Sequence, residues 1–252
     1  MPILSVINQK GGVGKTTTAV NLAAGLAQTR RVLLVDLDPQ ANATSGLGIE
    51  KSDTTVYDVL AGEASARRAA LPTDVENLFV LPASTDLAGA AIEIDESEDD
   101  VNLLKKGLLV VRASYDVILV DAPPSMGALT LNALVAADAL IVPVQTEYYA
   151  LEGIAQMLDT IERIKASLNP ELDVLGILLT MFDSRTNLSD QVEANVREHL
   201  EQQVFDTVIP RNVRLAEAPS YGQSIFTYAP SSTGALAYEA LAEEVLNRVA
   251  QR

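Results

Sequence analysis

The chain of 252 residues contains no cysteine, which excludes disulfides, thiolate zinc sites and cysteine-ligated iron–sulfur clusters. Hydrophobic residues make up 48% of the composition, which supports a packed core and argues against disorder. The formal net charge of −16 argues against a broad basic surface of the kind that binds nucleic acids.

The sequence shows no membrane-spanning or targeting segment. No apolar run approaches the roughly 18 residues that a membrane-spanning helix needs. Residues Met1 to Leu4 enter a strand pattern without a basic leader or a cleavage site. We therefore expect a cytoplasmic protein that makes no contact with a membrane.

Apolar runs typical of buried strands alternate with helical patterns along the chain. The predicted strands are Ile3 to Ile7, Val32 to Val35, Leu78 to Leu81, Val117 to Val120, Ala139 to Val144, Val174 to Leu179 and Thr207 to Ile209. The predicted helices are Lys15 to Gln28, Ala83 to Ile92, Leu103 to Ala113, Leu129 to Ala137, Ala150 to Ser167, Asn187 to Glu201 and Ala235 to Val249. This order predicts an α/β fold with a mostly parallel twisted sheet, helices on both faces, and one domain spanning residues 1–252.

An acidic run, Glu93 to Asp100, interrupts this alternation and holds six acids in eight residues. A run of like charges is usually solvated. We interpret it as a surface loop or a frayed helix start.

The first predicted strand leads into the segment NQKGGVGKTTT, residues 8–18. Its end fits the phosphate-binding pattern G-x-x-x-x-G-K-[ST], although Gln9 stands where the first glycine is expected. Glycines allow close backbone approach to an anion, Lys15 reaches phosphates, and the Thr16 hydroxyl suits Mg²⁺. The strand and helix on either side favour this interpretation over a tight turn with a solvated lysine. Lys10 is a second lysine that the pattern does not require.

Carboxylates follow two further strands, at the sheet edge where parallel α/β proteins bind ligands. Asp121 ends Val117 to Val120 and has the form of the acid beside Mg²⁺ in P-loop NTPases, although such an Asp can also cap a turn. Asp36 and Asp38 follow Val32 to Val35 and should point to opposite faces, so that only one meets the nucleotide. A carboxylate there can orient the attacking water. The alternative, an Asx-type turn before Pro39, suits Asp36 better than Asp38. The segment Pro39 to Thr44 reads as a loop that can reorganise with the phosphate state.

Five blocks give the sequence a family resemblance over almost its whole length: KGGVGKTT, VLLVDLDPQANATSGLG, VILVDAPPS, VPVQTEYYALEG and VIPRNVRLAEAPSYG. Together they closely resemble the ParA/Soj family of DNA-partitioning ATPases. The loop alone is shared by the wider deviant Walker A group, which includes MinD. The EYYALEG and PRNVRLAEAPS blocks are more specific to ParA/Soj.

The resemblance implies an ATPase that uses ATP and Mg²⁺ and forms a sandwich homodimer with ATP bound. Lys10 would be the signature lysine that reaches the phosphates of the partner subunit, while Lys15 serves its own subunit and Asp38 orients the catalytic water. The implied ATP-binding residues are Lys10, Gly11, Gly12, Val13, Gly14, Lys15, Thr16, Thr17, Pro210 and Asn212. The implied metal residues are Thr16, Asp38 and Asp121, the last acting through water.

The resemblance also implies that Arg185, Arg211 and Arg214 form a nonspecific DNA-binding surface. A dimer can gather a few arginines into one strip although the molecule is acidic. The alternative is that these arginines hold surface ion pairs of little energetic value. The implied partner is a centromere-binding protein of the ParB type, and the implied location is the nucleoid.

Two other functions remain open at the level of sequence. A MinD-like membrane switch needs a basic amphipathic helix, whereas the last predicted helix carries Glu239, Glu243 and Glu244. A metabolic phosphotransferase or ligase with the same loop needs a dedicated small-molecule pocket, which the sequence does not single out.

Overall fold

The computed structural model describes residues 1–94, 99–200 and 203–252. Within these ranges, seven strands form one twisted sheet with the order β3-β4-β2-β5-β1-β6-β7, and only β3 runs antiparallel to its neighbour. The strands are β1 (Ile3–Val6), β2 (Val32–Asp36), β3 (Leu71–Pro72), β4 (Leu78–Leu81), β5 (Val117–Asp121), β6 (Ala139–Gln145) and β7 (Asp173–Thr180). The α/β fold with a mostly parallel sheet, expected from the alternating pattern, is confirmed.

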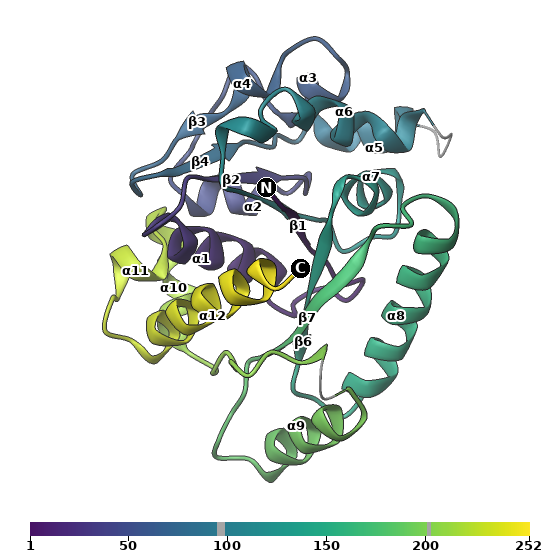
Figure 1. Cartoon of the computed structure of the whole chain (residues 1–252). Helices are drawn as coiled ribbons and strands as arrows, with labels where there is room; N and C mark the ends of the chain where they lie inside the picture. The colour runs from purple at the N-terminus through teal and green to yellow at the C-terminus, as the bar shows by residue number, and fades with distance from the viewer. Residues whose placement is uncertain (95–98, 201–202) are drawn as a thin grey trace.

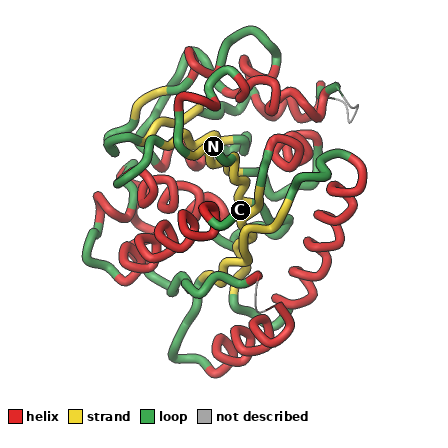
Figure 2. Tube along the Cα trace, viewed as in Figure 1, coloured by secondary structure: helices red, strands yellow, loops and turns green. Residues whose placement is uncertain are grey.

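Helices cover both faces of the sheet, as Figures 1 and 2 show. The described helices are α1 (Lys15–Ala27), α2 (Asn42–Gly46), α3 (Val56–Leu60), α4 (Ala66–Ala69), α5 (Leu87–Glu93), α6 (Leu103–Leu109), α7 (Ala128–Ala136), α8 (Ala150–Ser167), α9 (Asn187–Leu200), α10 (Val213–Glu217), α11 (Ile225–Tyr228) and α12 (Thr233–Ala250), with short 3-10 turns η1 (Asp100–Asn102), η2 (Arg112–Ser114) and η4 (Ala218–Tyr221). None of the helices in the described ranges is long and apolar enough to cross a membrane.

Two hydrophobic cores lie on opposite faces of the sheet because successive strand residues point to opposite sides. In β2, Leu33 and Val35 pack with α3 to α8, whereas Val32 and Leu34 pack with α1 and α12. The helices supply matching apolar faces; in α8, for example, Ile154, Met157 and Ile161 recur at helical spacing and are all buried. The strands are buried on both sides, so their carboxyl ends form the open edge where polar residues can gather.

One predicted strand is wrong. Residues Thr207 to Ile209 do not form a regular strand, although Ile209 N donates to Leu179 O at 2.9 Å on the edge of β7. Two residues earlier, Thr207 N donates to the Glu244 carboxylate of α12, at 2.9 Å, and not to a carbonyl of β7. Because that side chain takes the N–H a ladder would need, the segment follows the sheet edge without joining it.

Other departures concern short elements. Helices α2, α3, α4, α10 and α11 and the two-residue strand β3 were not predicted, and α2 lies in what was expected to be a loop. Of the acidic run, Glu93 ends α5 and Asp100 begins η1, whereas residues 95–98 lie outside the described part of the chain.

Gly176 in β7 offers a test of the packing on the α12 side of the sheet. A Cβ built on Gly176 would lie 2.5 to 2.8 Å from three atoms of the Phe205 ring, and that buried ring is also covered by the Arg248 guanidinium at 4.3 Å. We expect Gly176→Ala to lower the free energy of unfolding by about 1–3 kcal/mol through overpacking.

The measurement is urea unfolding at equilibrium. The control is Gly89→Ala in α5, where a Cβ meets no atom within 4 Å and the change should be neutral or stabilising. Equal stability of the two variants would show that the Phe205 ring is not fixed against β7.

Candidate nucleotide-binding site

The loop between β1 and α1 has the geometry of an anion site. Gly12 and Gly14 have φ of 77° and 88°, a left-handed conformation that favours glycine. No side chain caps the first turn of α1, which begins at Lys15. The backbone N–H groups of that turn and the positive end of the helix dipole are therefore directed at the mouth of the loop.

Two polar side chains fix this loop to neighbouring strands. Asn8 Nδ2 donates to Pro143 O at 2.8 Å, and Asn8 Oδ1 accepts from Lys10 N at 2.9 Å. The buried Thr180 hydroxyl donates to Val13 O at 2.9 Å. Sequence reasoning missed Thr180, although it ends β7 at the same edge as the acids after β2 and β5. Applying the rule of polar residues at carboxyl strand ends to β7 would have found it.

Lys15 lies inside the site and not in solvent. Its side chain is 7% exposed, and Nζ donates to Lys10 O at 2.9 Å. Burial lowers the pKa of Lys15, while the charges of Asp121 and Asp38 oppose that shift. The ammonium group is thus held near the two acids with capacity left for further acceptors, which excludes the alternative of a solvated turn lysine.

Asp121 is fully buried, and neither of its carboxylate oxygens has a hydrogen-bond partner. It lies beside Asp36 in the register of β5 and β2. Its pKa is raised well above the usual range, first by burial and then by the Asp36 charge, while the nearby Thr16 hydroxyl and Lys15 moderate the shift. A buried carboxylate without a partner is costly unless a cation or a proton compensates it.

The donor set at this edge fits magnesium better than a metal held by protein alone. Among the described residues, no group of three or more His, Cys, Asp or Glu side chains could hold a metal ion. Mg²⁺ keeps several waters and binds through one or two carboxylates together with substrate phosphates. Asp121 and the Thr16 hydroxyl, next to the glycine loop, are donors of the types that such a site uses.

Asp36 and Asp38 have different environments, as their spacing predicts. Asp36 is fully buried, and its carboxylate accepts hydrogen bonds from Thr44 N at 2.8 Å, Thr44 Oγ1 at 2.7 Å and Asp38 N at 3.2 Å. Burial raises the pKa of Asp36 to about 6 against these hydrogen bonds. Asp38 uses Oδ1 to accept from Gln40 N at 3.0 Å. Both acids therefore make a bond to the backbone two residues on, so the Asx-type turn expected for Asp36 occurs at Asp38 as well.

A cavity of about 330 Å³ adjoins the loop at Gly14 and Thr17. Pro210 and Asn212 line it together with Met181, whose φ of 53° is unusual for a side chain of this size. Asn212 also caps α10, because its Oδ1 accepts from Arg214 N at 2.8 Å. Pro210 and Asn212 therefore lie beside the phosphate loop, and the Asn212 side chain also has a structural role as a helix cap.

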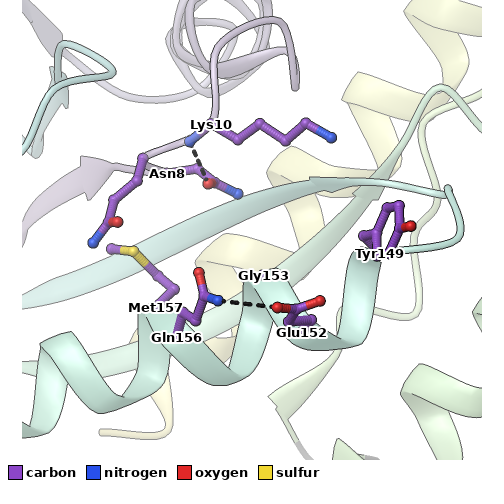
Figure 3. A pocket seen from close by; sticks show the side chains of 8 residues that line it. Asn8, Lys10, Tyr149, Glu152, Gly153, Gln156 and Met157 are labelled. Atoms are coloured by element: carbon purple, nitrogen blue, oxygen red, sulfur yellow. Dashed lines mark hydrogen bonds between the residues drawn. The ribbon is translucent and has the colours of Figure 1, made fainter.

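The Lys10 side chain points away from the site of Lys15 and has a different partner. Its ammonium group pairs with Glu147, in the loop after β6, and its side chain is 54% exposed. Figure 3 shows it extended above the first turns of α8, over a cavity of about 200 Å³ lined by Tyr149, Glu152 and Gln156. The two lysines of the loop therefore have different environments and different partners.

The three arginines expected to bind DNA are all exposed. An isolated bridge between Phe182 and Pro210 sets the segment of Arg185 beside that of Arg211, and Arg214 lies in the first turn of α10. Arg185 makes a two-pronged ion pair with Asp183 at 2.8 and 2.7 Å. Arg214 pairs with Glu217 at 2.8 Å. Arg185 and Arg214 therefore form the surface ion pairs that the alternative interpretation expects.

The sheet order, the glycine loop and the acids at the carboxyl strand ends define a P-loop ATPase of the deviant Walker A type. A family model described as an AAA domain matches residues 1–174. The chromosome-partitioning ATPase Soj of Thermus thermophilus is 55% identical over 247 residues, covering 98% of this chain and 96% of that protein. The chromosome partitioning protein ParA of Caulobacter vibrioides is 49% identical over 255 residues, covering 99% and 96%. This chain belongs to the Soj/ParA family of chromosome-partitioning ATPases.

A solved structure gives the same fold with ligands. Cobyrinic acid a,c-diamide synthase from Mycobacterium smegmatis, with bound ATP analog and magnesium, superposes with a TM-score of 0.86 at 40% identity, covering 99% of this chain and 96% of that one.

The buried acid pair predicts how stability depends on pH. Both Asp36 and Asp121 have folded-state pKa values above the unfolded value. Their contribution to stability is therefore complete below about pH 4 and is lost as pH rises through the raised pKa of each acid, which for Asp36 is about 6. Without metal or nucleotide, Tm should fall over this range, and it should fall less in Asp121→Asn.

Thermal unfolding in a chelator between about pH 4 and 8 measures this. The exposed Glu171→Gln variant controls for the change in net charge. Adding Mg²⁺ with ADP should restore Tm at high pH in the unmodified chain and restore less of it in Asp121→Asn. Equal pH profiles for both variants would contradict the assignment of Asp121 as the uncompensated group.

Proposed function

We propose that this chain is an ATP-dependent DNA-partitioning ATPase. With ATP bound it forms a sandwich homodimer that binds double-stranded DNA without sequence preference, and hydrolysis stimulated by a ParB-type partner releases it. The observation that carries the proposal is Asp121, a buried, unpartnered carboxylate beside an uncapped glycine loop, in a chain about half identical to partitioning ATPases over nearly its whole length. Its location would be cytoplasmic and associated with the nucleoid.

The residues of the loop and the strand ends divide the work of ATP hydrolysis. The N–H groups from Gly11 to Thr17 and the Lys15 ammonium bind and orient the phosphates. Thr16 and Asp121, with Asp38 nearby, would hold Mg²⁺, which would supply positive charge against the phosphate oxygens. Asp38 is the acid of this edge that is neither fully buried nor fixed by a side chain. It therefore orients the attacking water by accepting a hydrogen bond from it.

The adenine would occupy the cavity beside Gly14. Its volume of about 330 Å³ and its lining by Pro210, Met181 and Leu215 suit a flat apolar ring. Asn212 supplies a polar atom at the rim while it caps α10.

Lys10 makes dimerisation depend on ATP. Because Lys10 pairs with Glu147 at an exposed edge, its ammonium group is available to phosphates held by a second subunit once the pair opens. Each nucleotide's charge would then be neutralised from both chains, so ATP stabilises the dimer by binding it in preference to the monomers.

The two lysines should therefore behave differently when replaced. Lys15→Gln should abolish ATP binding, because the phosphates lose their counter-ion within the subunit. Lys10→Gln should leave nucleotide binding by the monomer measurable while the ATP-dependent dimer and hydrolysis are lost. Binding of a fluorescent ATP analogue and analytical ultracentrifugation measure the two properties separately. An unchanged ATP-dependent dimer in Lys10→Gln would exclude a role for Lys10 across the interface.

The DNA surface would consist of Arg185, Arg211 and Arg214 from both subunits. Each chain contributes three exposed arginines, so a symmetric dimer doubles them. DNA binding should therefore require ATP, show no sequence preference and weaken steeply with salt, because each phosphate contact adds about 0.9 to the salt slope on duplex DNA.

Removal of Arg214 should weaken binding to all sequences and lower the salt slope by up to about 2 per dimer. Arg185→Ala should act similarly, and the double variant more strongly. The measurement is a salt series of affinities with ATP in an Asp38→Ala background, in which slow hydrolysis removes turnover as a variable. Arg163→Ala is the matched control, because Arg163 is an exposed arginine paired with Asp159 on α8. Undiminished affinity in the double variant would place the DNA surface elsewhere.

Helix α12 offers the MinD-like alternative little free apolar surface, because its main apolar residues are buried. In α12 the residues Tyr238, Leu241 and Val245 are buried against α1 and cannot insert into a membrane while they are packed there. Pelleting with anionic liposomes, with and without ATP, tests this alternative directly.

The ligase alternative has one named relative, the 40% identical cobyrinic acid a,c-diamide synthase structure. The partitioning ATPases are more similar, at 49 to 55%. Sustained ATP turnover without DNA or a protein activator would favour the ligase.

A further inference from the structure

Helix α2 lies between the nucleotide edge of the sheet and the segment that carries Arg214. It follows the loop of Asp38 directly and begins at Asn42, after Ala41, whose φ of 51° is in the left-handed region. On its other side, α2 packs against η4 (Ala218–Tyr221). A short helix in this position can connect the two regions, and the contacts at each of its ends are specific.

The first contact joins α2 to the sheet. The Asp36 carboxylate accepts from both the N–H and the hydroxyl of Thr44, at 2.8 and 2.7 Å, and also from Asp38 N at 3.2 Å. The Thr44 hydroxyl in turn accepts from Ala83 N at 3.0 Å, after β4. One buried carboxylate thus contacts both Asp38, at the start of the loop, and Thr44, in α2, which makes Asp36 a positioning residue.

The second contact joins the end of α2 to the turn after η4. Gly48 and Gly222 have φ of 78° and 64°, and their backbones meet without a side chain between them. A Cβ on Gly222 would lie 2.7 Å from Gly48 Cα, and one on Gly48 would lie 3.2 Å from Gly222 O. A displacement of one backbone must therefore move the other, because no side chain lies between them that could change rotamer instead.

The third step leads from Gly222 to the arginine. Helix α10 continues directly into η4, and Glu217 at their junction accepts from Arg214 Nη1 at 2.8 Å and from the Tyr228 hydroxyl at 3.0 Å. Tyr228 stacks on the exposed Tyr221, with ring centroids 5.0 Å apart. The direction of the Arg214 side chain is therefore set by the same segment that Gly48 contacts.

We propose that the Asp36–Thr44 hydrogen bonds and the Gly48–Gly222 contact form one mechanical connection, through which the loop of Asp38 positions the Arg214 segment in response to nucleotide. The DNA readout of this connection rests on the proposed function. Rearrangement of the Asp38 to Ala41 loop shifts α2, α2 shifts the Gly48 backbone, and Gly222 carries the shift into η4 and α10.

Two glycines with nearly the same backbone conformation, Gly48 and Gly62, distinguish the effect of the Gly48–Gly222 contact from the effect of backbone strain. Gly48→Ala adds a methyl group against Gly222, whereas Gly62→Ala, with φ of 76°, adds one where no atom lies within 4 Å. Both variants pay the same cost of an alanine in the left-handed region. We expect Gly48→Ala to weaken ATP-dependent DNA binding about 3- to 30-fold relative to Gly62→Ala, the range of typical coupling through a packed network, with ATP binding and dimerisation equal in the two. Equal DNA affinity would overturn the proposal.

A second measurement does not depend on DNA. Amide hydrogen exchange over residues 213–222 should change when ATP is added to the unmodified chain. Thr44→Val removes the hydroxyl that joins Asp36 to Ala83 and should abolish this change, whereas Thr44→Ser keeps the hydroxyl and should restore it. A purely structural role of Thr44 would leave the ATP response of residues 213–222 unaltered in Thr44→Val. An unaltered response, or none in the unmodified chain, overturns the connection.

The two experiments also separate the inference from the proposed function. If the unmodified chain binds no DNA with ATP, the proposed function fails, and hydrogen exchange alone decides the connection. If DNA binds but Gly48→Ala and Thr44→Val behave as their controls do, the proposed function stands and the connection fails.

Discussion

Two carboxylates buried side by side, Asp36 on β2 and Asp121 on β5, are the constraint around which the nucleotide edge of this structure is organised. Carboxylates of like charge cannot both stay ionised in a buried site without compensation. The chain compensates Asp36 internally, through Thr44, and leaves Asp121 with no hydrogen-bond partner. This asymmetry separates their tasks: one acid holds the loop that follows it, and the other is available to a cation.

The same constraint explains why the Lys15 side chain is drawn into the site. Burial of an ammonium group is unfavourable by itself, and its pKa falls accordingly. Asp121 and Asp38 lie close enough to offset part of that cost. A nucleotide with its magnesium ion would add charge of both signs to this cluster, so binding completes an electrostatic arrangement that the free chain leaves unbalanced. Such a site favours ligand binding to the folded chain over the unfolded one.

Sequence alone predicted the parts of the fold that rest on long patterns. Buried strands such as Leu78–Leu81 and long helices such as Ala150–Ser167 follow from periodicity, and their bounds match the prediction. Helices of four or five residues, such as α2, are shorter than the pattern needed to detect them. Helix α3 is an exception that could have been found, because Thr55 and Asp58 form a capping box. The segment at Thr207 could not, since its departure from the sheet depends on Glu244, 37 residues away.

The predicted site residues come together because parallel strands end at one edge, a rule that requires no coordinates. What the sequence could not give is the partner of each side chain. Lys10 and Glu147, or Asp36 and Thr44, are paired by tertiary structure and not by a local pattern. Asp36 and Asp38 are two residues apart in sequence, yet Asp36 accepts from Thr44 and Asp38 accepts from Gln40.

The partners of the arginines also bear on how an acidic molecule could bind DNA. Arg185 and Arg214 already hold carboxylates, so contact with a DNA phosphate exchanges one ion pair for another and gains little at each arginine. A single chain with so few arginines would then bind weakly, and in the proposed function the doubling of the set in a dimer, with release of counterions from DNA, would supply the difference. In the proposed function the acidic character of the chain is therefore no obstacle, because it keeps the monomer off DNA and makes binding depend on the ATP-bound dimer.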